Sequence, residues 1–213
     1  MIETKEKFEF SSKNQIKADQ YISRYPAGKQ QSAVMPLLYL AQNQNGGWLN
    51  QAVLEYIADY LSMSAIKVYE VATFYTMYNL KPVGKHHIQL CRTTPCWLRG
   101  ANSIAEAICE KLSIKHGETT PDGKFTLTEV ECLGACVNAP VVQINNDFYE
   151  DLDKKSMKKI LELLQENSTP SSGSQKQRHT SAPQSGPKTL ITLGEKKNVK
   201  RSRSYIYKLI WLE

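Results

Sequence analysis

The stretch that decides the fold is HIQLCRTTPC at 87–96, taken together with LTEVECLGAC at 127–136. The first segment ends in a C-x4-C loop, Cys91 to Cys96. The second ends in a C-x3-C loop, Cys132 to Cys136, and 35 residues separate the two pairs. Thiolates are soft ligands, and four of them in two short loops suit zinc or an iron–sulfur cluster. We therefore interpret the two loops as one metal site.

Each cysteine loop directly follows a predicted strand. Alternation of apolar and polar residues, with a turn signal at Asn145-Asn146-Asp147, predicts strands at 87–90, 125–131, 141–144 and 148–149. Apolar residues at spacings of three and four predict helices at 101–112 and 154–165. The resulting order, β-α-β-β-α, is typical of a small α/β layer. Because both loops follow strands, we expect them to meet at one end of the sheet.

Helical patterns fill the chain before residue 80. They predict four helices, at about 13–23, 30–44, 50–61 and 65–78. The last of them, AIKVYEVATFYTMY, is apolar or aromatic on most sides. An all-round apolar helix is usually buried in a core, but a surface kept for a partner subunit has the same composition. Both interpretations can hold for different faces of this helix.

The charge of the chain divides unevenly along its 213 residues. Residues 171–213 carry nine Lys/Arg against two Asp/Glu, whereas residues 1–170 have a net charge of −1. The body therefore lacks the electrostatic footprint of a nucleic-acid-binding protein. The stretch after about residue 167 is rich in Ser, Pro, Gln and Gly, which favours a disordered or extended tail or a peptide that wraps a neighbour. We expect a helical region at 1–80, an α/β domain at 81–167 and a basic tail at 168–213.

The cellular location is predicted from the membrane-spanning and targeting patterns that the sequence lacks. No apolar run approaches the roughly 20 residues of a membrane span. The opening IETKEKFEF resembles neither a secretory signal nor an Arg-rich transit peptide. These observations predict an intracellular protein whose cysteines are reduced and free to bind metal.

Several alternatives for the cysteines can be compared by spacing. A C-x-x-C redox pair and the C-x4-C-x2-C pattern of plant-type ferredoxins are both missing from the sequence. A Rieske centre needs two His ligands, but His86 and His87 point to opposite faces of a strand, and we expect all four His at the surface. A four-cysteine zinc module remains a rival. Cys109 lies on a predicted helix and is interpreted as a buried structural thiol.

The cysteine spacing resembles that of the thioredoxin-like [2Fe-2S] ferredoxins. The segments EVATFYTMYNLKPVGKHHIQLCRTTPCWLRGA and TLTEVECLGACVNAPVVQINNDFYEDL further resemble the E-subunit family of NADH-quinone oxidoreductase, the respiratory complex I. The resemblance covers about residues 8–191. It implies an N-terminal helical bundle followed by a thioredoxin-like ferredoxin domain. It also implies one [2Fe-2S] cluster bound by Cys91, Cys96, Cys132 and Cys136.

The same resemblance implies a role in electron transfer. The chain would be one subunit of an NADH:quinone oxidoreductase without a complete active site of its own, and it carries no nucleotide-binding fingerprint. FMN and NADH are expected on a partner flavoprotein subunit within the peripheral arm of complex I. The expected location is the cytoplasmic face of a bacterial inner membrane, or else the matrix side of a mitochondrial one, with membrane association only through the complex. An equivalent subunit of an NAD-linked hydrogenase or formate dehydrogenase remains an alternative.

Overall fold

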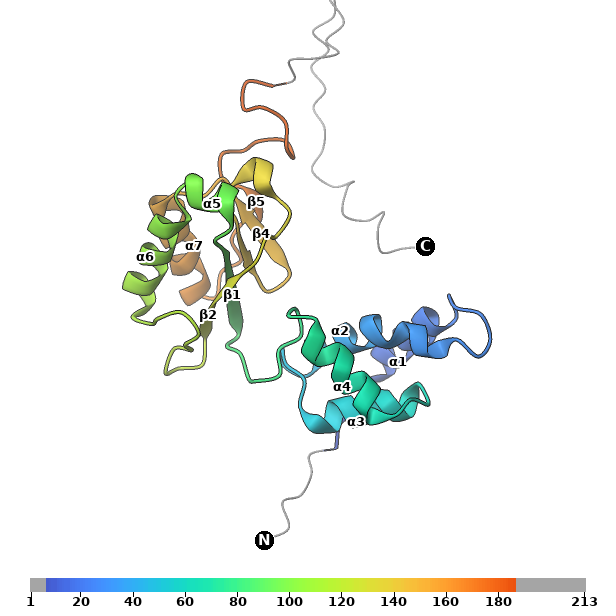
Figure 1. The fold of residues 1–213 in the computed structure, drawn as a ribbon. Coiled ribbons are helices and arrows are strands. Elements are labelled where there is room, and N and C mark those ends of the chain that lie inside the picture. Colours follow the sequence, from blue (N-terminus) through green and yellow to red (C-terminus); the bar gives the residue numbers. More distant parts are fainter. Residues whose placement is uncertain (1–6, 187–213) are drawn as a thin grey trace, which may run out of the picture.

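The computed structural model describes residues 7–186. Helices come first along the chain, and a sheet with its own helices follows (Figure 1). No helix among residues 7–186 has the length and apolar character needed to cross a bilayer. The helical part consists of α1 Ser12–Ile22, η1 Gln30–Ala33, α2 Val34–Gln44, α3 Gln51–Tyr60 and α4 Ala65–Phe74.

The helices α1 to α4 share one hydrophobic core. The apolar positions that recur in α2 and α3 are the buried ones, among them Leu37, Leu38, Leu54 and Ile57. The α3 helix begins where the Asn50 side chain accepts a hydrogen bond from the Val53 N–H at 2.9 Å. These helices were predicted, although the first turn of the second is a separate 3-10 helix.

The helix α4 differs from its prediction in length and burial. It ends at Phe74 rather than near residue 78, because Tyr75 has an extended backbone and Tyr78 turns back to donate to the Met35 carbonyl at 2.9 Å. Only Val68 and Ala72 of this helix are buried. The interpretation as a wholly buried core helix is therefore wrong for most of its surface.

The second half contains a five-stranded mixed sheet with the order β2-β1-β3-β4-β5. Its strands are β1 His86–Cys91, β2 Phe125–Val130, β3 Val142–Ile144, β4 Asp147–Glu150 and β5 Gly173–Ser174. The β1 and β2 strands run parallel, so their carboxyl ends share one edge of the sheet. The β3–β4 pair is the predicted antiparallel hairpin. The α/β class expected from the sequence is confirmed.

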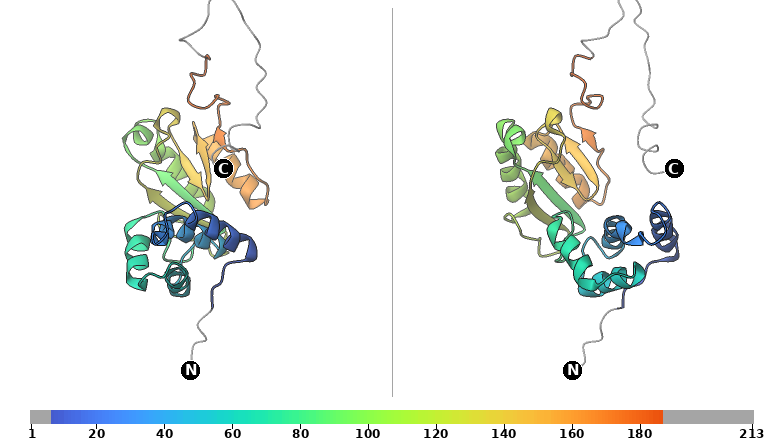
Figure 2. Two further views of the ribbon diagram at one scale, coloured as in Figure 1. Left: turned by 90° about the vertical axis from the view of Figure 1, so that its right-hand side faces the viewer. Right: turned by 45° about the vertical axis from the view of Figure 1, so that its right-hand side comes forward.

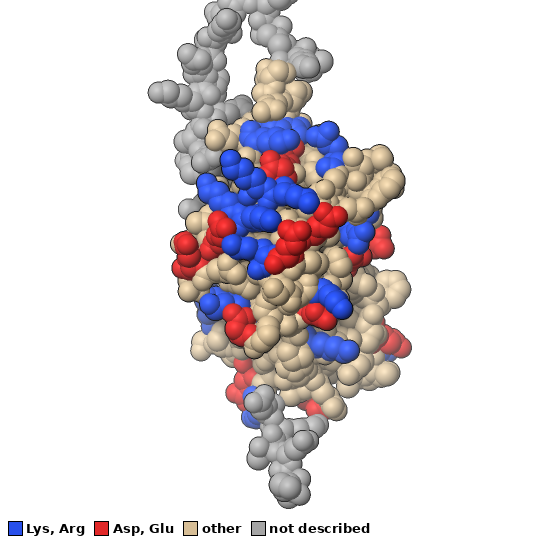
Figure 3. Space-filling model, turned by 90° about the vertical axis from the view of Figure 1, so that its left-hand side faces the viewer, with Lys and Arg blue, Asp and Glu red and all other residues tan. Residues whose placement is uncertain are grey.

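Two long helices cover one face of the sheet, namely α6 Ala101–Leu112 and α7 Lys154–Gln165 (Figure 2). Their bounds match the predictions. Ile104 and Ile108 of α6 pack with Leu161 of α7 and with Ile88 and Leu90 of β1. Salt bridges also join the two helices, and their outer face shows basic and acidic side chains interspersed (Figure 3). The helices and β1 thus form one packed unit that fixes where β1 ends.

The burial of His87 contradicts the expectation that all four His lie at the surface. His87 is only 7% exposed, and its Nε2 lies 2.9 Å from the Thr128 hydroxyl of the neighbouring strand. Burial lowers the pKa of this imidazole. His87 is therefore an interior hydrogen-bonding residue of the sheet and not a surface histidine.

The tail begins with structure that the sequence analysis did not anticipate. The β5 strand pairs parallel to β4 as the edge of the sheet. Residues 175–186 continue as turns and extended chain. The aromatic and basic segment VKRSRSYIYKLIWLE at 199–213 lies outside the described residues.

The start of α7 provides a first prediction. Asp153 accepts from the Ser156 N–H at 2.7 Å, and the Ser156 hydroxyl accepts from the Asp153 N–H at 2.9 Å, forming a capping box. We expect Asp153→Ala to lower the free energy of unfolding by about 1 kcal/mol in urea titrations. The capping bond lowers the pKa of Asp153, so this contribution should be present at neutral pH and fade as the pH falls through that pKa.

A matched substitution lies at the other end of the same helix. Gln165 is exposed, and Gln165→Ala should change the free energy of unfolding by no more than about 0.5 kcal/mol. Equal effects of the two substitutions at pH 7, or an Asp153→Ala deficit that persists unchanged at pH 2, would contradict the capping role.

Candidate functional site

The two cysteine loops meet at the carboxyl ends of β1 and β2. Cys91 is the last residue of β1, and Cys132 follows β2 after one intervening residue. Cys96 lies on a short helix, α5 Thr94–Leu98, and Cys136 begins the 3-10 helix η2 Cys136–Asn138. Because β1 and β2 are parallel neighbours, all four side chains are delivered to the same edge of the sheet.

The sulfur atoms form two pairs that face each other. The Sγ atoms of Cys132 and Cys136 are 3.3 Å apart. Cys91 and Cys96 are hydrogen-bonded through their side chains, and Cys91 also interacts electrostatically with Cys132 and Cys136. The structure thus brings together all four cysteines that the sequence singled out.

The first pair is buried and the second is open to solvent. Cys91 and Cys96 are each 1% exposed and pack with Ala101, Ala139 and Val141. Cys132 is exposed and Cys136 is partly exposed. An electron-transfer centre placed here would be enclosed on the side of the first loop and approachable on the side of the second.

The thiol pKa values are set unequally within each pair. Burial raises the pKa of Cys91, but hydrogen bonds with Thr93, with the Leu133 backbone and with Cys96 outweigh it, so the pKa is lowered overall. Burial and the bond to Cys91 raise the pKa of Cys96 to about 12. A hydrogen bond from the Gly134 N–H lowers the pKa of Cys132. Each loop therefore contains one thiol whose pKa is lowered, and the thiolate is the form that binds metal.

The Cys136 thiol completes this pattern. Its hydrogen bond with Cys132 raises its pKa. Within residues 7–186, no three Cys, His, Asp or Glu side chains are grouped tightly enough to be ligands of a single metal ion. A [2Fe-2S] cluster divides its four thiolate ligands between two irons and needs no other protein ligand. The donor set of two facing thiol pairs fits that group.

The second cysteine loop takes its shape from Gly134. This residue has a φ of +79°, a left-handed conformation that glycine adopts without strain. Its N–H points at the Cys132 sulfur at 3.4 Å. The N–H group is positioned to stabilise negative charge on the sulfur.

The cysteine spacing predicts a plain loop at 91–96, whereas the structure has the short helix α5 there. Pro95 lies in the first turn of this helix, where its missing N–H costs nothing. Thr93 stands at the N-cap position, and Gly100 at φ +98° separates α5 from α6. The Thr-Thr-Pro sequence before Cys96 was the available signal. The consequence is that Cys96 is held by helical backbone rather than by a mobile loop.

The fifth cysteine is separate from the site. Cys109 lies on α6 and packs, partly buried, against the core between the helices and the sheet. Burial raises the pKa of its thiol. Cys109 is partly exposed, so the prediction of a fully buried thiol overstated its burial.

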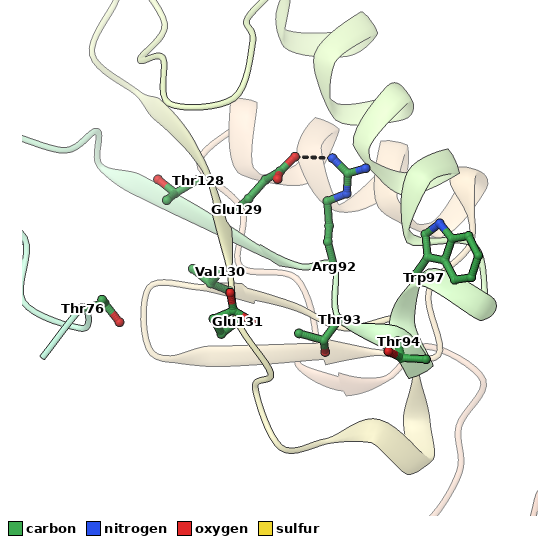
Figure 4. Close-up of a pocket in the computed structure, with 9 residues that line it drawn as sticks. All are labelled: Thr76, Arg92, Thr93, Thr94, Trp97, Thr128, Glu129, Val130 and Glu131. Carbon is green, nitrogen blue, oxygen red and sulfur yellow. Dashed lines mark hydrogen bonds and ion pairs between the residues drawn. The ribbon is translucent and has the colours of Figure 1, made fainter.

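A depression of about 860 Å³ lies beside the first cysteine loop (Figure 4). Its wall contains Arg92, whose guanidinium pairs with Glu129 and donates to the Asn102 side chain at 2.8 Å. Glu129 also lies 3.2 Å from His116 Nε2. The lining residues are Thr76, Arg92, Thr93, Thr94, Trp97, Thr128, Glu129, Val130 and Glu131. The depression therefore joins the end of the helical half to the first cysteine loop.

Exposed apolar side chains follow Cys96 and Cys136 directly in the sequence. Trp97 and Leu98 on α5 are 54% and 69% exposed, and Val137 beside Cys136 is 68% exposed. Large apolar side chains in a group on a surface mark interaction sites more often than isolated ones do. These three residues could not be identified from the sequence, because an apolar residue beside a cysteine has no distinctive pattern.

The chain is similar to known proteins in both sequence and structure. The family model for thioredoxin-like [2Fe-2S] ferredoxins matches residues 18–165. The E subunit of the NADH-quinone oxidoreductase of Rickettsia prowazekii is 59% identical over 155 residues, which are 73% of this chain and 88% of the relative. The mitochondrial NADH dehydrogenase [ubiquinone] flavoprotein 2 of Dictyostelium discoideum is 45% identical over 184 residues, which are 86% of this chain and 74% of the relative.

One solved structure shows the fold. An NAD+-reducing [NiFe]-hydrogenase in the air-oxidized state aligns with a TM-score of 0.54 over 61% of this chain and 23% of that chain. At 21% sequence identity, this likeness concerns the fold alone.

Proposed function

Because the chain belongs to the thioredoxin-like [2Fe-2S] ferredoxin family, and within it to the E subunits of NADH-quinone oxidoreductase, we propose that it is the [2Fe-2S] electron-transfer subunit of a complex I-type NADH:quinone oxidoreductase. The observation that carries the proposal is the convergence of two thiol pairs at the ends of two parallel strands. Cys91, Cys96, Cys132 and Cys136 are the proposed ligands. The bound cluster would supply a one-electron donor and acceptor.

The residues around the cysteines support this role. Backbone N–H groups of Leu133 and Gly134 direct positive dipole ends at the sulfurs of Cys91 and Cys132. Such contacts favour negative charge on sulfur and tune the potential of an iron–sulfur site. Val141 and Ala139 cover the buried pair and exclude water from it. This chain therefore offers ligands, fixed dipoles and a dry wall, but no catalytic group of its own among these residues.

We further propose that the electron donor is a separate flavoprotein subunit that binds FMN and NADH, together with other peripheral-arm subunits. The exposed Trp97, Leu98 and Val137 beside the cysteine loops support a partner that docks close to the cluster. The proposed location is the cytoplasmic face of a bacterial inner membrane, with the matrix side of a mitochondrial inner membrane as the alternative. The bacterial and mitochondrial relatives make both locations reasonable.

Metal analysis and spectroscopy test the proposal. We expect the purified chain to contain iron and acid-labile sulfide in equal amounts, to be red-brown and to give a paramagnetic signal after reduction. Stoichiometric zinc in a colourless protein would instead indicate a four-cysteine interaction module.

A second candidate function has the same chemistry in a different complex. The likeness to the NAD+-reducing hydrogenase extends to the fold and leaves an equivalent subunit of an NAD-linked hydrogenase or formate dehydrogenase as an alternative. Identification of the chains that co-purify with the native protein distinguishes the two. A hydrogenase or formate dehydrogenase catalytic subunit among them would replace the complex I assignment.

A further inference from the structure

The tail carries a structured segment against the second cysteine loop, and we name residues 173–186 the strap. It begins as β5, which pairs with β4, and the Gln175 N–H then donates to the Glu150 carbonyl at 2.9 Å. The strap lies beyond residue 165, where the match to the ferredoxin family model ends.

Arg178 is the centre of the strap. Its Nε donates to the Ala182 carbonyl at 2.9 Å and its Nη2 to the Ser181 carbonyl at 3.2 Å, so the strap folds around its own arginine. The remaining nitrogen, Nη1, donates outward to Asp151 at 3.0 Å and to the Val137 carbonyl at 3.3 Å. A guanidinium has its donors in a rigid plane, so these bonds fix its orientation.

The two outward partners of Arg178, Val137 and Asp151, lie on two segments that are joined by a backbone hydrogen bond. Val137 follows Cys136 directly in the sequence. Asp151 follows β4, is 5% exposed, and donates its N–H to the Asn138 carbonyl at 2.7 Å. The Asn138 side chain in turn donates to the Thr180 carbonyl of the strap at 2.9 Å. The strap thus contacts the end of the second cysteine loop at Val137 and at Asn138.

The ion pair between Arg178 and Asp151 is well shielded. The side chains are 13% and 5% exposed, and the Ser174 hydroxyl donates to the other oxygen of Asp151 at 2.6 Å. Removing one partner of such a pair leaves an uncompensated charge away from water. The carboxylate would then have to recruit water or move, and its backbone is bonded to the cysteine loop.

We propose that Arg178 is a positioning residue for the cluster: by joining Asp151 to the Val137 carbonyl, it holds the loop of Cys132 and Cys136 in the shape that retains iron. This inference rests on the proposed function, since it presumes that these cysteines bind the cluster. The second pair is the solvent-exposed one, so its retention depends on the loop more than that of the buried first pair.

The experiment measures iron release from the reconstituted full-length chain to a chelator, with visible circular dichroism of the cluster and thermal unfolding followed in parallel. Arg178→Ala is expected to release iron about tenfold faster, at the lower end of the roughly tenfold to hundredfold loss of metal affinity seen when a group supporting a metal ligand is removed. Lys176→Ala, which removes the same charge from an exposed position of the strap, should release iron at the rate of the unchanged chain.

Two further variants separate positioning from charge. Arg178→Lys keeps the charge but cannot reproduce the planar set of bonds, so it should also release iron faster than the unchanged chain. Arg178→Ala combined with Asp151→Asn removes the unpaired carboxylate and should recover part, but not all, of the retention.

Three results would overturn the inference. They are an Arg178→Ala chain that keeps iron as long as the unchanged chain, an Arg178→Lys chain with unchanged release, and iron loss that coincides in every variant with global unfolding. A different result, an unchanged chain that assembles no iron and sulfide at all, would contradict the proposed function itself.

Discussion

Cys96→Ala is expected to abolish cluster assembly, lowering iron and sulfide per chain by about tenfold or more, because even the loss of a supporting contact of a metal ligand weakens metal binding by roughly tenfold or more. Cys96 is 1% exposed and held on the α5 helix between Pro95 and Trp97. Its sulfur has no solvent-derived substitute in that packed position. A methyl group there leaves one iron short of a ligand, so the effect should be all or none.

Substitution of the exposed pair should give a milder and graded result. In Cys132→Ser a hydroxyl takes the place of the sulfur that the Gly134 N–H contacts at 3.4 Å. Oxygen is a harder and less acidic donor than sulfur, so assembly should be impaired and the spectrum shifted. Water can also reach this site, because Cys132 is exposed.

The matched control is Cys109→Ser. This residue is also a cysteine of the same domain, but it packs against the α6 and α7 core. Iron and sulfide content should equal that of the unchanged chain. Equal loss in Cys96→Ala and Cys109→Ser, or full assembly in both, would contradict the ligand assignment. Far-ultraviolet circular dichroism of each apoprotein checks that the fold is intact.

Much of the sheet and its site could be predicted because the signals are local. The α6 and α7 helices match their predicted bounds, since apolar residues recur at regular spacing and Asp153 caps the second of them. The two cysteine loops could be placed at one edge of the sheet because both follow strands. Regular periodicity and strand order therefore account for the site.

What could not be predicted depends on partners distant in sequence. The β5 strand is only Gly173–Ser174, which has no apolar pattern and exists because β4 offers an unpaired edge. Arg178 pairs with Asp151, and neither residue displays that pairing in its local sequence. His87 is buried because Thr128 of the adjacent strand satisfies its ring nitrogen. These are tertiary contacts. Composition alone predicts a disordered or extended tail for the segment that contains β5 and Arg178, and a surface position for His87.

The interpretation of α4 as a buried core helix is wrong for a different reason. A hydrophobic residue is equally compatible with a core and with a surface that a partner covers. The apolar residues after Ser64 are compatible with a core and with a partner-covered surface, but only Val68 and Ala72 of α4 are buried. We name the exposed apolar side chains of α4 and of the three residues after it the α4 patch. They are Ile66, Tyr69, Phe74, Tyr75 and Met77.

The second large effect is expected at this patch. Phe74 is 77% exposed and its ring lies against Tyr75 with centroids 5.0 Å apart. Thr76, two residues further, lines the depression beside the first cysteine loop (Figure 4). The chain directly after Tyr75 therefore reaches the depression beside the first cysteine loop. A flavoprotein subunit that covers both surfaces would bury the aromatic residues and bring its flavin close to the cluster.

If the proposed FMN-containing subunit is the partner, we expect Phe74→Glu to weaken its binding by about 30-fold, the effect of losing an interface hot spot. A carboxylate there would be desolvated without a counter-charge when the partner docks. Binding is measured by titrating the partner subunit into the cluster-loaded chain by calorimetry. Cluster content and thermal unfolding should not change, because Phe74 is largely exposed.

Ile16→Glu is the matched control, since Ile16 is an apolar residue that is 61% exposed on α1 and outside the α4 patch. It should bind the partner with the affinity of the unchanged chain. Normal binding by Phe74→Glu, or an equal loss in both variants, would mean that the α4 patch is not the docking surface. Loss in Phe74→Glu alone, with the cluster intact, would separate docking at the α4 patch from cluster assembly at the cysteine loops.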